Sequence, residues 1–262
     1  MQLNWINTTA GFGVGLLVGL TGVGGGSLMT PIMILLLGVA PSTAVGTDLW
    51  FAAITKIVGA WAHDRKGTID RQILRRMFYG SIPAALLTLF WLHASGMEQS
   101  HNQLMFKTLG GTLILTSVAA VFRKRFHAWG VRMRGARPIE FKSLQPALTV
   151  LAGAILGFLV TFTSIGAGAL GAVMLLYLYP LRLTAKSLVG TDITHAIPLT
   201  ILAGTGHLIL GNVNYVLLFN LLLGSIPGIV LGAFVSTYAP DKIVRSAISV
   251  MLAVVGAKMV LA

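Results

Sequence analysis

A dense cluster of glycines interrupts the first apolar segment of the chain. It has the sequence Gly22-Val23-Gly24-Gly25-Gly26-Ser27, and Thr30 and Pro31 follow it. Glycines at this density open a helix and leave N–H groups unpaired, which a bilayer tolerates only where the backbone is buried in protein or lines a cavity. Thr30 suits an N-cap and Pro31 the first helical position, so we expect a half-helix to begin there. The free N–H groups at its start would bind an anion.

A second cluster with the same character is Thr163-Ser164-Ile165-Gly166-Ala167-Gly168-Ala169, which lacks the Thr-Pro pair. Its candidate anion contacts are Ser164, Gly166 and Gly168. The alternative is that the glycines of both clusters only allow close helix packing, as small residues do in membranes. Neither cluster is a phosphate loop, because no Gly-Lys-Ser/Thr follows it.

Ionisable side chains inside apolar segments are the second chemical signal. They are costly there and usually face a cavity or a partner. Asp192 and His195 lie three residues apart on one helix face, where a proton could pass between them. Lys56 lies about 12 Å along a helix from Asp48, eight residues away, and could supply positive charge for an anion.

Asp48 and Asp192 each follow a threonine, Thr47 and Thr191. We expect the two threonines to contact the anion, and Asp48, Asp192 or His195 to carry protons. An equally weighted alternative is that both aspartates only stabilise helix termini or pair with a basic group, since they lie within two turns of the predicted helix starts.

The sequence favours neither an enzyme nor a metal protein. It contains no His-Glu-x-x-His, no Gly-x-Ser-x-Gly and no clustered carboxylates. The absence of cysteine excludes disulfides, thiolate metal sites and a cysteine nucleophile. We therefore expect no catalytic residues, no bound metal and no cofactor.

Composition assigns the chain to the membrane. Of its 262 residues 55% are hydrophobic and only 10% charged, and the mean hydropathy is +0.84. The net charge of +12 would suggest nucleic acid in a soluble chain, but in a multi-pass membrane protein it marks cytoplasmic loops. We predict a multi-pass protein of a bacterial inner membrane, with the lipid bilayer and not nucleic acid as its surroundings. The start of the chain lacks the basic region of a signal peptide. The oligomeric state stays open.

Hydropathy predicts apolar segments at 5–38, 44–62, 77–93, 104–122, 146–180, 188–210, 215–236 and 243–261. Most have the length of one spanning helix. The segments 5–38 and 146–180 are too long for one span and contain the glycine clusters. They are either re-entrant hairpins or pairs of short spans.

The two halves of the chain are copies of each other. Val45-Gly46-Thr47-Asp48 recurs as Val189-Gly190-Thr191-Asp192, and Gly80-Ser81-Ile82-Pro83 as Gly224-Ser225-Ile226-Pro227. These pairs, the glycine clusters and the His63/His207 pair share one offset of 144 residues without a gap. We therefore predict a first transmembrane repeat at 1–122, a basic cytoplasmic linker at 123–145 and a second repeat at 146–262.

Charge predicts that the copies are inverted. Loop 63–76 is basic where its counterpart 207–220 has no Lys or Arg, whereas 182–187 is basic where 38–43 is uncharged. If each long segment enters and leaves on one side, all 19 basic residues except Lys56, Lys107 and Lys258 fall on one side. The predicted fold is an all-α polytopic membrane protein of two inverted repeats, each with a glycine-broken first segment and three spanning helices. Both termini would lie outside.

The sequence resembles the TauE/SafE family, the sulfite exporter or toluene sulfonate uptake permease family. The resemblance rests on Gly22 to Gly26 with Pro31, on Ala44-x-Gly46-Thr47, and on Gly166-x-Gly168 with Gly190-Thr191, and it covers nearly the whole chain. It implies a secondary carrier for sulfur-containing anions such as sulfite, thiosulfate, sulfonates and sulfoacetate. Where this family commonly has a small residue after Gly-Thr, this chain has Asp48 and Asp192.

From the residues and the resemblance together we expect a transporter that moves such an anion by alternating access, with protons as a possible coupling ion. A passive anion channel and a carrier of a non-sulfur organic anion are the alternatives. Import and export remain equally open, as does the identity of the anion.

Overall fold

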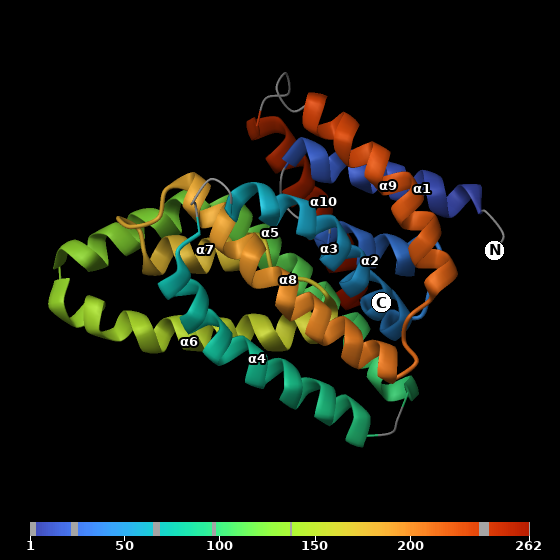
Figure 1. Ribbon diagram of the computed structural model, residues 1–262, viewed down its shortest axis with the longest axis horizontal. Helices are drawn as coiled ribbons and strands as arrows, with labels where there is room; N and C mark the ends of the chain where they lie inside the picture. The colour runs from blue at the N-terminus through green and yellow to red at the C-terminus, as the bar shows by residue number, and fades with distance from the viewer. Residues whose placement is uncertain are drawn as a thin grey trace.

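The computed structural model of the chain is helical (Figure 1). It describes residues 4–21, 26–64, 69–95, 98–136, 138–235 and 241–261. All regular secondary structure in these residues is α-helix, which confirms the predicted all-α class. The helices are α1 (Trp5–Thr21), α2 (Gly26–Leu35), α3 (Pro41–Asp64), α4 (Arg71–Ala94), α5 (Glu98–Ala136), α6 (Pro138–Thr163), α7 (Ala169–Leu178), α8 (Ala185–Ile209), α9 (Tyr215–Val235) and α10 (Asp241–Leu261).

In both over-long apolar segments the structure describes two helices instead of one. In the first segment α1 is followed by α2, and in the second α6 is followed by α7. The second helix of each pair has ten residues. At 1.5 Å per residue it is about 15 Å long, half of the roughly 30 Å hydrocarbon layer, so α2 and α7 are half-helices.

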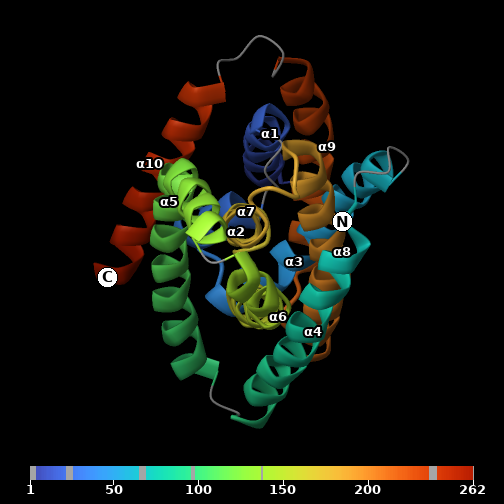
Figure 2. The same ribbon diagram turned by 90° about the vertical axis from the view of Figure 1, so that its left-hand side faces the viewer.

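Four helices of the described chain are long and apolar enough to cross a membrane, namely α4, α5, α6 and α9. The central helices α3 and α8 have 24 and 25 residues but carry more polar side chains. In Figure 2 α1, α2, α7 and α6 form a column between α5 and α10 on one side and α3, α4, α8 and α9 on the other. Polar residues on α3 and α8 can thus face protein instead of lipid.

The basic segment 123–145 is helical in its described residues. α5 continues through it to Ala136, and α6 begins at Pro138. With 39 residues α5 is about 58 Å long, nearly twice the hydrocarbon thickness. One end of α5 must therefore extend out of the membrane.

The two repeats are intertwined. Helix α1 packs along α9 and its counterpart α6 packs along α4, so the first helix of each repeat lies on the fourth helix of the other. The counterparts α3 and α8 also contact each other, as do α5 and α10. Each half thus packs against the other through equivalent helices, and neither half forms a separate body.

Glycines set the distance between the exchanged helices. A methyl group on Gly80 of α4 would lie 1.8 Å from the carbonyl oxygen of Val150 in α6, and one on Gly224 of α9 would lie 1.9 Å from that of Thr8 in α1. Neither position has room for a side chain, so the backbones touch. The repeated Gly-Ser-Ile-Pro motif thus supplies the close contact that small residues make in membranes.

The contacts give the offset between the first helices of the two repeats. Gly11 of α1 faces Leu221, and Gly153 of α6 faces Met77. The two contact partners are 144 residues apart, but the two glycines are 142 apart. The offset of 144 was found for residues from Gly22 onward, and the first helices, which precede Gly22 and its counterpart, are related by an offset of 142. The second repeat has two more residues after its first helix, in the region of its break.

The central helices α3 and α8 run antiparallel. A methyl group on Gly46, near the start of α3, would lie 3.1 Å from Cβ of His207, near the end of α8. One turn further along, Gly204 of α8 faces Leu49 and Trp50 of α3. The repeat-related helices at the centre thus point in opposite directions.

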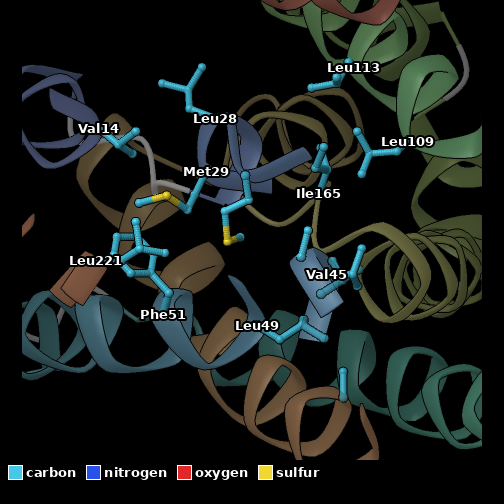
Figure 3. Close-up of a cluster of buried hydrophobic side chains, with 14 of the residues drawn as sticks. Val14, Leu28, Met29, Val45, Leu49, Phe51, Leu109, Leu113, Ile165 and Leu221 are labelled. Carbon is cyan, nitrogen blue, oxygen red and sulfur yellow. The ribbon is translucent and has the colours of Figure 1, made fainter. Parts of the chain in front are cut away.

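An apolar core joins the two repeats around α2. Figure 3 shows Leu28 and Met29 of α2 among Val45, Leu49 and Phe51 of α3, with Val14, Leu109, Leu113, Ile165 and Leu221 contributed by other elements of both repeats. Met29 and Leu49 are fully buried. The half-helix α2 is therefore held by apolar packing rather than by a lipid-facing surface.

Replacing Gly80 tests the exchanged packing. We expect Gly80→Ala to lower the thermal unfolding temperature of the detergent-solubilised protein, because the new methyl group overlaps the α6 backbone at a cost of about 1–3 kcal/mol. Gly111→Ala on α5 is the matched control, since a methyl group there meets nothing within 4 Å. If both variants unfold at the wild-type temperature, the α4–α6 contact is not as close as described.

Candidate functional site

The ionisable residues predicted inside apolar segments lie on the two central helices and are buried. The exposed fractions are 0% for Asp48, 7% for Lys56, 4% for Asp192 and 0% for His195. Asp48 and Lys56 belong to α3, and Asp192 and His195 to α8. Because the repeats exchange partners, one buried cluster receives residues from both.

Asp48 is bound to the half-helix α2. Its Oδ2 accepts a hydrogen bond of 2.5 Å from the Thr30 hydroxyl, while its Oδ1 has no partner in the described chain. Ser164, in the break of the other repeat, lies close to the same carboxyl group. A carboxyl oxygen buried without a partner is costly and marks a position where a proton, water or ligand can bind.

The position of Thr30 corrects one sequence prediction. The half-helix begins at Gly26, and Pro31 lies inside it, so Thr30 is not its N-cap. The Thr30 hydroxyl points instead to Asp48. Gly26 and Ser27 belong to the first turn of α2, and both residue types can adopt helical dihedral angles. The helix is therefore about one turn longer at its start than the sequence predicted.

Asp192 also lies against a half-helix, α7, but through close contact and not through a described hydrogen bond. A methyl group on Gly171 would lie 2.2 Å from Oδ1 of Asp192, so only a glycine allows this approach. Like its counterpart, Oδ1 of Asp192 has no hydrogen-bond partner among the described residues. Sequence reasoning missed both Gly171 and the role of Thr30. The available signal was that Gly171 and its repeat mate Ser27 are both small.

The break between α6 and α7 has the open backbone that its glycines predicted. Gly166 and Gly168 have φ angles of 128° and 124°, which disfavour other residues, and Ser164 adopts a left-handed φ of 60°. Such a conformation in a serine costs about 1–3 kcal/mol and persists mainly at functional sites.

Unpaired polar groups gather around this break. No side chain caps α7, and the N–H groups of Ala169 and Leu170 have no acceptor in the described chain. The Ser164 hydroxyl is also buried without a partner there. Gly22, Gly24 and Gly25 of the first cluster lie outside the described residues, and the described side chains of α2 begin at Leu28.

Lys56 supplies the positive charge of the cluster. It is close enough to Asp48, Asp192 and His195 to interact electrostatically with each of them. No ion pair to Lys56 occurs among the described residues. One ammonium group thus serves two carboxyl groups without being fixed to either.

His195 is hydrogen-bonded to α4. Its Nε2 lies 2.9 Å from the Ser81 hydroxyl, and its ring lies 5.2 Å from that of Phe78 between centroids. No hydrogen bond joins His195 to Asp192, and Nδ1 of His195 has no partner in the part of the chain described. A proton passing between the two would need a rotamer change or a bridging water.

Thr47 and Thr191 make two equivalent contacts between the repeats. The Thr47 hydroxyl accepts a hydrogen bond of 3.1 Å from the backbone N–H of Asn214, before α9. The Thr191 hydroxyl accepts one of 2.9 Å from the N–H of Asp70, before α4. Both contacts fall on repeat-related positions. The two hydroxyls are thus engaged in holding helix starts, and neither is directed at a glycine cluster by a described hydrogen bond.

The two ends that these threonines hold are not alike. At the Thr191 end Asp70 caps α4 and forms a two-pronged ion pair with Arg182, with Nε–Oδ2 at 2.7 Å and Nη2–Oδ1 at 3.0 Å. The equivalent residues at the Thr47 end are Asn214 and Gly38, which cannot form an ion pair. There an open cavity of about 650 Å³ is lined by Asn4, Trp5, Leu37, Val39, Asn214 and Leu217, among others.

Comparisons with known proteins agree with this architecture. Residues 8–259 match the family model described as Sulfite exporter TauE/SafE. The chain is 39% identical over 257 residues to the probable membrane transporter protein YjnA of Bacillus subtilis, covering 95% of this chain and 97% of that protein. It is 27% identical over 245 residues to the probable membrane transporter protein YdhB of the same organism, covering 94% and 95%.

No solved structure gives a significant match to the chain. The family match covers nearly the whole sequence, and both relatives are similar to it over almost their full length. The chain is therefore a multi-pass membrane transporter that belongs to the TauE/SafE sulfite exporter family.

Proposed function

We propose that the protein is a proton-coupled secondary transporter of sulfur-containing oxyanions or organosulfonates, of the sulfite, thiosulfate and sulfoacetate class. The family description supports the substrate class. The observation that carries the coupling is the pair of buried aspartates, Asp48 and Asp192. Each contacts a half-helix, and each has one carboxyl oxygen without a hydrogen-bond partner among the described residues.

The N-terminal end of a half-helix attracts negative charge because its N–H groups are unpaired. Asp192 already lies against the first turn of α7. An ionised Asp192 would therefore compete with a bound anion and repel it, whereas a protonated Asp192 would not. Anion binding then requires a proton on the Asp192 carboxyl group, so the anion and the proton are transported together.

Lys56 and Ser164 complete the proposed site. Lys56 lies within electrostatic reach of both carboxyl groups and would balance the charge of the anion. Ser164, Gly166 and Gly168 form the break, whose free hydroxyl and amides can donate to oxyanion oxygens. Gly22, Gly24, Gly25, Gly26 and Ser27 would contribute the equivalent contacts from the first repeat.

Alternating access would come from the contacts at the two ends of the molecule. The Thr191 end has the ion pair of Asp70 with Arg182, and the described residues at the Thr47 end form none. We infer that the ion pair holds the Thr191 end closed. An inverted arrangement would place these ends on opposite sides of the membrane, and the antiparallel α3 and α8 support it. The ion pair between Asp70 and Arg182 also supports the inverted arrangement. It joins loops 63–76 and 182–187, which parallel repeats would place on opposite sides of the membrane.

The proton coupling is tested by removing the carboxyl groups. In proteoliposomes we expect Asp48→Asn and Asp192→Asn to reduce sulfite accumulation driven by an inward proton gradient to the level of protein-free vesicles. Glu140→Gln, which removes an exposed carboxyl group on α6, is the control and should transport normally. Uptake that follows the sulfite gradient alone, in wild type and variants, would identify a passive channel instead.

The ion pair is tested by exposing the site. The protein has no cysteine, so Thr194→Cys on the buried part of α8 provides a single reactive thiol. We expect Arg182→Gln to raise the labelling rate of this thiol about fivefold, with a hydrophilic thiol reagent added from the Arg182 side. The reason is that an exposed ion pair stabilises the closed end by up to about 1 kcal/mol. Arg182→Lys should label more slowly than Arg182→Gln. Equal labelling rates in all three proteins would exclude a gate at this pair.

The inverted topology is tested by single cysteines at the loops. We expect Arg71→Cys and Lys186→Cys to react with an impermeant reagent only after the cell membrane is permeabilised, and Asn212→Cys to react in intact cells. Reaction of Lys186→Cys in intact cells, with Arg71→Cys protected, would indicate parallel repeats.

A further inference from the structure

A basic and aromatic groove lies on the part of α5 that continues past the predicted span 104–122. It encloses about 450 Å³ and is lined by Phe122, Arg125, Phe126, Ala128, Trp129 and Arg132. The transport site uses none of these residues. Phe122, Arg125, Trp129 and Arg132 follow each other at intervals of three and four residues, which places them on one face of the helix.

The opposite face of this part of α5 is held by α7. A methyl group on Gly130 would lie 2.4 Å from the carbonyl oxygen of Tyr177, so the two backbones touch. Nε2 of His127 lies 3.1 Å from the carbonyl oxygen of Pro180. The helix is thus fixed in rotation, and the groove face with its exposed Arg125, Trp129 and Arg132 is turned away from α7.

The groove carries unbalanced positive charge. Neither Arg125 nor Arg132 has an acidic partner among the described residues. The Arg125 guanidinium lies 5.1 Å from the ring centroid of Phe122, which orients it along the groove without neutralising it. A guanidinium is planar and pairs with phosphate oxygens through two parallel hydrogen bonds. The charge and shape of the groove therefore complement a phosphate ester.

The depth of the groove matches the lipid headgroups. The apolar span ends at Phe122, and Arg125 lies about 4.5 Å further along the helix axis. The headgroup layer extends about 5–8 Å beyond the hydrocarbon on each side, so Arg125 lies within it. Trp129, with 62% of its surface exposed, lies about 6 Å further along the axis, on the aqueous side of this layer.

The geometry points to a binding site for the headgroup of an anionic phospholipid on this face of α5. Arg125 binds the phosphate, and the ring of Phe122 contacts the glycerol and the first part of the acyl chains. Arg132, about 10 Å further along the helix axis, attracts the anionic headgroup from its aqueous side, across the ring of Trp129. The bound lipid holds α5 at the membrane surface, next to the α7 half-helix that carries the transport site.

The test is lipid binding by the full-length protein in detergent, measured by native mass spectrometry during titration with phosphatidylglycerol. We expect Arg125→Gln/Arg132→Gln to bind this lipid roughly 30-fold more weakly than wild type, as the loss of two basic groups at an anionic surface predicts. Arg71→Gln/Arg75→Gln removes two exposed arginines from α4 and is the matched control, which should bind normally. Arg125→Lys/Arg132→Lys should retain most of the binding.

Competition identifies the source of the phosphate. Phosphatidylcholine at equal concentration should not displace phosphatidylglycerol, and neither inorganic phosphate nor sulfite should. Displacement by phosphatidylcholine would show only general lipid contact, and displacement by sulfite would show a vestibule for the transported anion. Equal loss of binding in the α4 control would show a diffuse charge effect. Each of these three results would overturn the site, and unchanged circular dichroism of the variants would show that they are folded.

Discussion

The cost of removing polar groups from water controls this structure. Inside a bilayer each unpaired donor or acceptor must be buried in protein, and several such groups of this chain lie on the half-helices and on the central helices. Asp48, Asp192, Ser164 and the first amides of α7 all lie where helices of both repeats meet. The surrounding helices α4, α5, α6 and α9 are apolar enough to face lipid. The polar centre exists only because this apolar layer encloses it.

Close packing makes the polar centre possible. Gly80 and Gly224 bring the exchanged helices into backbone contact, and Gly171 does the same for the side chain of Asp192 against α7. The exchange of partners means that neither repeat can complete its own half of the site. Asp48 of the first repeat lies beside Ser164 of the second, so motion of one repeat relative to the other changes the surroundings of both carboxyl groups.

The Thr47 end and the Thr191 end of the molecule share one architecture and differ in a few residues. Thr47 and Thr191 retain the same hydrogen bond to the start of a neighbouring helix. The salt bridge of Asp70 with Arg182 belongs to one end only, where Asn214 and Gly38 are the equivalents at the other. If the proposed alternating access holds, this ion pair is the difference that distinguishes the two ends.

The sequence by itself determined the helical membrane class, the duplication, the two broken segments and the burial of the ionisable residues. These follow from local composition and spacing. A run of about 20 apolar residues forms a helix in a bilayer, and glycines as close together as Gly166 and Gly168 favour an interruption of that helix. The prediction that Thr30 is an N-cap was wrong. The Thr30 hydroxyl binds Asp48, which lies 18 residues away in the sequence, and local sequence does not reveal such a partner. It gave no indication that His195 bonds Ser81 or that Gly171 faces Asp192.

Only the tertiary structure decided how the repeats pair. The packing of α1 on α9 and of α6 on α4, and the two-residue difference in register between them, arise from contacts between residues 70 or more positions apart. Such contacts leave no periodicity in the sequence. They depend on which glycine-containing helix surfaces fit together once all helices are present. The packing energy depends on both surfaces of a pair, so neither segment alone reveals it.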